Sequence, residues 1–271
     1  MSRYMNILSA PYNLFFGIEK RLRFIISSII LTTLLMVSTF FFFDKAFIFL
    51  PLLIVTAYAC TYFSILEGIE KIEWVTLFLM PVLVTVAFYL FYFLFPTRWI
   101  TRIPFLAFYG VSIYAALLVS NIFNVGVEKS LQLYRAAFSV NYFYQSLIVF
   151  LFANLILSFK LNFLVAGLLF FALGFVVAMH LFWSIRLELY LEAKLTRYAL
   201  FVGFILFQTA VVTSFIPLQS SVMALFLSTI FYCVGGLTYL HLDERLFKET
   251  VREYLLVLAI VAGLTIMTLI L

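Results

Sequence analysis

Charged residues are scarce in this chain, and their scarcity excludes a water-soluble fold. Only 11% of the 271 residues are Asp, Glu, Lys or Arg, whereas 66% are hydrophobic. A soluble domain carries roughly 25% charged residues and about 45–50% apolar ones. A lipid-facing surface can be built from this composition, and no Pro/Gly/Ser-rich linker divides the chain. The sequence therefore predicts one integral membrane domain over residues 1–271, with the lipid bilayer as its partner.

Catalytic and metal-binding motifs are also lacking. The two aspartates, Asp44 and Asp243, form no DxxD or DxxxD pair that could hold Mg²⁺ on a diphosphate. No HExxH zinc motif, G-x-S-x-G elbow or Walker A loop occurs. The two cysteines, Cys60 and Cys233, lie in apolar segments and predict no disulfide framework. These absences favour a protein that is not an enzyme and that needs no cofactor or metal.

Long apolar runs are what the sequence has instead. A helix of about 20 apolar residues crosses the hydrocarbon core of a bilayer, and continuous runs of this length exclude the strands of a membrane β-barrel. No Asp, Glu, Lys or Arg lies deep in any run, which argues against a proton-coupled pump. The predicted fold is an all-α polytopic bundle of about nine spanning helices, at 24–43, 46–66, 74–95, 103–123, 136–158, 163–184, 198–216, 221–240 and 254–271.

Three further segments have helical spacing outside these spans. Apolar residues recur at i, i+3 and i+4 in the N-terminal segment before the first span, which predicts a helix in the membrane interface; a tail without structure is the alternative. The links 186–197 and 242–254 are predicted to be helical and continuous with the span that follows. In the first link, Glu188 and Glu192 are four residues apart and would share one helical face.

Prolines and glycines inside the spans predict local departures from straight, widely spaced helices. Pro51 and Pro81 are expected to kink their helices or to open short unwound segments. Pro104 is placed at the start of its span, where a first-turn proline is tolerated. The glycines predict the places where two helices approach most closely; these are Gly167 with Gly174, and Gly235 with Gly236.

Basic residues are distributed unequally between the two sides of the predicted membrane. With the N-terminus in the cytoplasm, 13 of the 17 Lys and Arg residues fall on the cytoplasmic side. A bias of this size over short loops is the positive-inside signal, so the net charge of +5 is not a sign of a nucleic-acid partner. The prediction is a multi-pass protein of the inner membrane, with the N-terminus inside and, after nine spans, Leu271 outside.

Neutral polar residues gather in the cytoplasmic half of the predicted spans. Amides and imidazoles in lipid need hydrogen-bond partners, and hydrogen bonding between helices is the simpler of two explanations. The other is a polar cavity open to the cytoplasm, with carboxylates at its rim. A metal site at His180 and His241 has a weaker basis, because only two histidines are present. The candidate cavity residues are Asn121, Asn124, Asn141, Gln145, His180, Glu188, Glu192, His241 and Glu244.

Two stretches carry a resemblance to other proteins. The sequence NIFNV at 121–125 and the sequence LDERLFKETVREY at 242–254 resemble a group of multi-pass bacterial membrane proteins that have no assigned activity. The resemblance runs through the second half of the chain. It implies a bacterial inner membrane and contributes no catalytic residue.

Three hypotheses about function follow. The first is a non-enzymatic scaffold or complex subunit, whose charged cytoplasmic face docks other membrane or cytoplasmic proteins. The second is a carrier or flippase for a neutral or lipid-linked molecule, which would use the polar groups of the cytoplasmic half. The third is a membrane enzyme that acts at the cytoplasmic face through His180, His241 and neighbouring acids. A closely packed interior favours the first hypothesis, and a hydrated cavity favours the other two.

Overall fold

A computed structural model describes residues 19–41, 46–65, 74–94, 99–125, 131–187 and 192–270. Across these residues there are no strands, and nine helices are each long and apolar enough to span a membrane. The predicted all-α, nine-helix membrane fold is confirmed, and the chain is a multi-pass membrane protein. The helices are α2 (Lys20–Phe41), α3 (Ala46–Ile65), α4 (Trp74–Tyr92), α5 (Trp99–Val125), α6 (Leu131–Ser158), α7 (Phe163–Trp183), α8 (Ala193–Thr213), α9 (Ser220–Leu242) and α10 (Lys248–Ile270).

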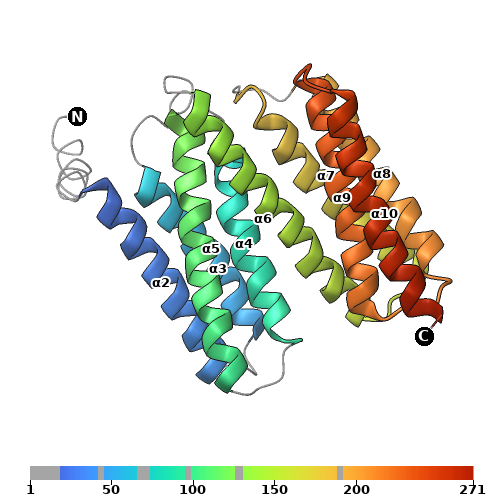
Figure 1. Cartoon of the computed structure of the whole chain (residues 1–271). Helices are drawn as coiled ribbons and strands as arrows, with labels where there is room; N and C mark the ends of the chain where they lie inside the picture. Colours follow the sequence, from blue (N-terminus) through green and yellow to red (C-terminus); the bar gives the residue numbers. More distant parts are fainter. Residues whose placement is uncertain are drawn as a thin grey trace.

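The nine helices form two groups that meet at α6 (Figure 1). The first group is α2 to α5, and the second is α7 to α10. Helix α6 contacts α4 and α5 on one side and α7 and α9 on the other. Helix α2 begins at one end of the bundle and α10 ends at the opposite end (Figure 1), as an odd number of spanning helices requires.

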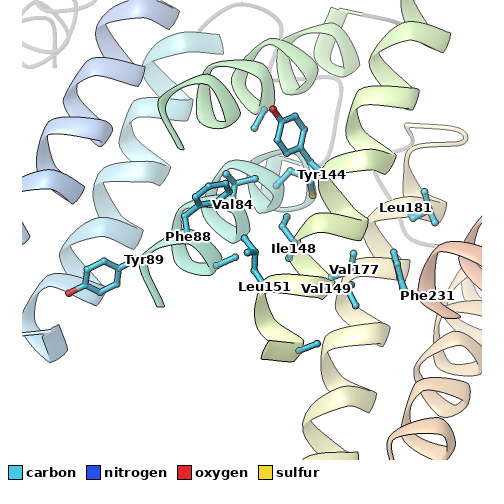
Figure 2. Close-up of a cluster of buried hydrophobic side chains, with 14 of the residues drawn as sticks. Val84, Phe88, Tyr89, Tyr144, Ile148, Val149, Leu151, Val177, Leu181 and Phe231 are labelled. Carbon is cyan, nitrogen blue, oxygen red and sulfur yellow. The ribbon is translucent and has the colours of Figure 1, made fainter. Parts of the chain in front are cut away.

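The core follows α6 because two of its faces are buried (Figure 2). Ile148 lies near Val84 and Phe88 of α4, whereas Val149 lies beside Val177 of α7 (Figure 2), and all five side chains are at most 1% exposed. Aliphatic and aromatic residues therefore join the two groups into one packed interior.

Several helices begin earlier than the apolar pattern predicts. Helix α5 begins at Trp99, four residues before the predicted span, and α10 begins at Lys248, six residues before. A helix does not end where its apolar residues end, since long polar side chains can extend to the membrane interface. For the same reason the first-turn prediction for Pro104 is wrong, because this residue is the sixth of α5.

The predicted helical links are only partly correct. Residues 243–247 lie outside any helix, with a turn at 243–244 in which Glu244 has a φ of 58°, and α10 begins at Lys248. In the other link, Leu187 has a φ of 53° and Glu192 is extended just before α8. Glu192 therefore lies outside any helix, so the prediction that it shares a helical face with Glu188 is wrong for Glu192. Glu188 itself, and the predicted helix before the first span up to residue 18, lie outside the described residues.

Prolines in three spans leave the helices unbroken. Helices α3, α4 and α5 continue through Pro51, Pro81 and Pro104, so the described residues contain no unwound segment at these positions. The carbonyl oxygen of Pro81 accepts a hydrogen bond from the Thr85 hydroxyl at 2.8 Å. That bond is to the proline's own carbonyl. The carbonyl that Pro81 leaves without an N–H donor is that of Leu77, four residues earlier, and it accepts a hydrogen bond from the Ser120 hydroxyl of α5 at 3.2 Å.

Glycines set the close approach of α7 and α8. A Cβ on Gly174 would lie 3.1 Å from the Cα of Gly203, and a Cβ on Gly203 would lie 2.8 Å from the backbone oxygen of Phe171. The predicted close-packing role of Gly174 is confirmed. Gly236 has a similar role, because a Cβ added there would collide with the hydroxyl of Tyr142. Gly203 was not predicted.

Candidate functional site

One hydrogen bond links two of the predicted site residues across neighbouring helices. Gln145 of α6 and His180 of α7 approach to 2.8 Å between Nε2 and Nδ1, and their side chains are 0% and 1% exposed. The donor is set by the histidine tautomer. The ring of His180 also lies 5.7 Å from that of Trp183. The hairpin of α6 and α7 therefore positions a polar pair inside the bundle.

Asn141 lies one helical turn before Gln145 and is the least satisfied polar residue of the site. Its side chain is 1% exposed, and neither its Oδ1 nor its Nδ2 has a hydrogen-bond partner among the described residues. The Oε1 of Gln145 is in the same condition. A buried polar group without a partner costs about 1–3 kcal/mol. The two amides are four residues apart on α6, as the predicted shared face requires, but only the Nε2 of Gln145 has a described hydrogen-bond partner.

The two α5 amides lie near the end of that helix. Asn124 is 7% exposed, and the Oδ1 of Asn121 is buried without a hydrogen-bond partner among the described residues. The Ser120 hydroxyl, on the residue directly before Asn121, donates to the carbonyl oxygen of Leu77 at 3.2 Å, which ties α5 to α4. No described hydrogen bond joins Asn121 to the amides of α6.

An apolar cluster lies beside His180 at this end of the bundle. We call it the end cluster. It contains the last residue of α3 and of α7 and residues near the ends of α4 and α5, and it includes Trp183, which is in ring contact with His180. Nearby, the Tyr134 hydroxyl donates to the carbonyl oxygen of Ser184 and ties α6 to the end of α7. The end cluster is formed by Ile65, Leu77, Phe78, Val119, Phe123, Ala137, Trp183 and Leu187.

The remaining predicted residues are not brought to this pair by any described contact. His241 lies in the last turn of α9, where its exposed side chain has its ring 6.2 Å from that of Tyr198 on α8. Glu192 forms an ion pair with Arg186, and Glu244 lies in the exposed turn after α9. In the part of the chain that the structure describes, no three His, Cys, Asp or Glu side chains are grouped as a metal would require.

Two arginines inside helices were not predicted from the sequence: Arg23 is buried and Arg102 is half-buried. Arg23, in the first turn of α2, is only 2% exposed. One turn further on, the Ser27 hydroxyl accepts a hydrogen bond from Ser64 at 2.9 Å and donates to the Cys60 carbonyl at 3.2 Å. Arg102 of α5 lies over the ring of Phe40, 5.1 Å from its centroid. The sequence signal for the burial of Arg23 was its position directly before an apolar run. Because α2 begins at Lys20, before that run, Arg23 lies within the helix and faces the bundle.

Two cavities are lined by residues of the second helix group. One, of about 510 Å³, is lined by Lys194, Arg197, Tyr198 and Phe201 of α8. The other, of about 480 Å³, lies between α8, α9 and α10. Asn141, Gln145 and His180 line neither of them.

Comparison with protein-family models, with curated proteins and with solved structures finds no match to this chain. Its function is therefore argued from its own residues.

Proposed function

We propose that the protein is a non-enzymatic scaffold or subunit of a membrane complex, with a docking face at its charged end. The observation that carries this proposal is the burial of Gln145 and His180, which are bonded to each other, with Trp183 of the end cluster in ring contact with His180. A buried polar pair that bonds across two helices fits the hydrogen bonds that hold membrane helices together. A carrier or an enzyme would need that pair to be reachable from water.

The proposed docking face is the end of the bundle at which α2, α8 and α10 begin. Most described charges gather there, whereas the opposite end carries Arg102 and Lys160 among the described residues. Positive-inside asymmetry supports a cytoplasmic position for the charged end. Charges of both signs are paired at this end, since Arg245 Nη1 lies 3.3 Å from Asp243 Oδ2 and Arg186 pairs with Glu192.

The proposed location is a bacterial inner membrane, with Leu271 outside. It rests on the charge asymmetry and on the resemblance at 121–125 and 242–254. The partner that fits the docking face is a protein surface of mixed charge, because acids and bases alternate over Lys248–Glu253 in the exposed first turns of α10.

Cross-linking in native membranes tests this proposal. We expect one partner of defined mass to be cross-linked to the chain and to be lost in the double variant Glu249→Lys/Glu253→Lys. The matched control is Lys160→Glu, an exposed charge reversal at the opposite end, which should keep the partner. The proposal fails if no discrete partner is cross-linked, or if both variants lose it equally.

A carrier for a neutral molecule is the second candidate, and Asn141 is the observation that favours it. An amide with two buried atoms and no described partner is costly unless something else binds it. A hydrated path from the charged end to Asn141 would support this candidate, and the two proposals therefore differ in whether water reaches α6.

A further inference from the structure

Helix α8 presents one apolar stripe that no other described helix covers. Phe201 and Phe204 are 52% and 50% exposed, and Val212 is 64% exposed. Together with exposed Gln208 they are spaced by three, four and four residues, so they lie along one side of the helix. We call these four residues the α8 stripe.

Gln208 is the polar residue in the middle of this stripe. Arg197, at the charged end, lies eleven residues or about 16.5 Å before Gln208 along α8, and the helix ends at Thr213, five residues or about 7.5 Å after it. Because the hydrocarbon core is about 30 Å thick, the Gln208 amide lies within the core and not at an interface. No described residue forms a hydrogen bond with it. By contrast, the hydroxyls of Thr209 and Thr213 donate to carbonyls of their own helix at 2.8 Å and 2.7 Å.

A groove runs beside the stripe and includes Gln208 in its wall. It has a volume of about 480 Å³; Phe226 and Ile230 of α9 and Ala262 and Ile266 of α10 line the sides that face α8. Helix α10 has no buried residue. Helices α9 and α10 lie at the edge of the bundle far from α2 (Figure 1). A projecting stripe and a hollow therefore lie next to each other on one membrane-facing side.

We infer that a second copy of this chain packs against the α8 stripe, with Gln208 of each copy bonded to Gln208 of the other. A glutamine amide carries donors and an acceptor, so it complements itself across a two-fold axis, where the same patch meets itself. Lipid tails can cover the phenylalanines but offer no hydrogen bond at this depth, where an unpaired amide costs several kcal/mol. The stripe of each copy enters the groove of the other.

A single polar residue in an apolar seam also fixes the register of two helices, as a buried asparagine does in a coiled coil. This dimer lies within the membrane and away from the charged end of the bundle. It goes beyond the proposed docking function, because dimer formation and partner docking can fail independently.

Disulfide cross-linking in native membranes tests the dimer. The variant Gln208→Cys should give a species of twice the chain mass under a mild oxidant. The matched control is Leu168→Cys on the exposed side of α7, 60% exposed and near the depth of Gln208, since Gly167 packs against Phe207. The wild-type chain is the second control, because Cys60 and Cys233 are buried. Neither control should give the dimer.

Energy transfer between labelled chains in vesicles measures the role of the amide. We expect Gln208→Leu to weaken association about 3- to 18-fold, the range measured for hydrogen bonds between membrane helices, and Gln208→Asn to retain most of it. The inference is overturned if Gln208→Cys gives no dimer, if Leu168→Cys gives as much, or if Gln208→Leu associates as the wild type does. A photo-reactive residue at position 208 that links only to lipid or to an unlike protein would also overturn it.

Discussion

Gln145 and His180 form a hydrogen bond between α6 and α7, with 2.8 Å between Nε2 and Nδ1, where both side chains are at most 1% exposed. Each residue supplies the other with a partner that lipid cannot offer. The pair therefore links the central helix of the bundle to the second helix group, and its energetic coupling can be measured.

A double-mutant cycle at this pair should give positive coupling. Gln145→Leu leaves the imidazole of His180 buried without its partner, and His180→Phe does the same to the amide. We expect each single variant to lose about 1–3 kcal/mol of unfolding free energy. The double variant should lose less than the sum by about 0.6 kcal/mol or more. Unfolding in detergent measures all four chains, and strictly additive losses would mean that the bond contributes nothing.

Replacement of Asn141 by an apolar residue should have the opposite effect on the stability of the protein. Its buried amide has no described hydrogen-bond partner, so Asn141→Leu removes a desolvation cost of about 1–3 kcal/mol and adds apolar contact. The thermal midpoint in detergent should stay the same or rise. A fall as large as that of Gln145→Leu would indicate that the amide is satisfied in the membrane, by water or by a ligand.

Gly203→Ala should loosen the pairing of α7 and α8. The new methyl group would lie 2.8 Å from the Phe171 oxygen and 3.2 Å from the Phe175 nitrogen, and backbone atoms cannot move aside as a side chain can. Overpacking of this kind costs about 1–3 kcal/mol, which thermal unfolding would detect. Gly263→Ala is the matched control, because nothing lies within 4 Å of its added methyl. Equal effects in the two variants would contradict the role of Gly203.

The orientation of the chain can be tested with a reporter enzyme that is active only in the cytoplasm. Fused after Leu271, it should be inactive, and fused within the turn at Glu244 it should be active. The expected pattern follows from nine spans with the N-terminus inside. Activity after Leu271 would require a different orientation or a different number of spans.

Much of the fold follows from the sequence because membrane helices are specified by long apolar runs. The starts of the helices were predicted less accurately than their number. Helix α5 begins at Trp99 and α10 at Lys248, before their apolar runs, because helical hydrogen bonding continues into polar residues. The close approach of Gly203 had a signal in Ala199 four residues earlier, a small-xxx-small spacing. Both residues face into the packed interior.

Gln145 and His180 were each singled out from the sequence as polar residues within spans, but the bond between them was not predicted. The spacing of Asn141 and Gln145 placed them on one face, yet nothing in a single sequence indicates that Gln145 meets His180, 35 residues away. For the same reason His180 and His241 were considered together, although the described contact of His241 is with Tyr198 on α8. Contacts between helices depend on how the helices rotate and pack, which hydropathy alone does not encode.

Thiol accessibility in native membranes tests the packed interior most directly. Asn141→Cys and Gln145→Cys would each be treated with a membrane-impermeant maleimide applied from the cytoplasmic side. Lys194→Cys is the positive control, and the wild-type chain with buried Cys60 and Cys233 is the background. We predict that the Lys194→Cys chain is labelled at once, and that the two α6 variants are labelled only after denaturation. Rapid labelling of Asn141→Cys in the folded protein would contradict the scaffold account and support a hydrated carrier.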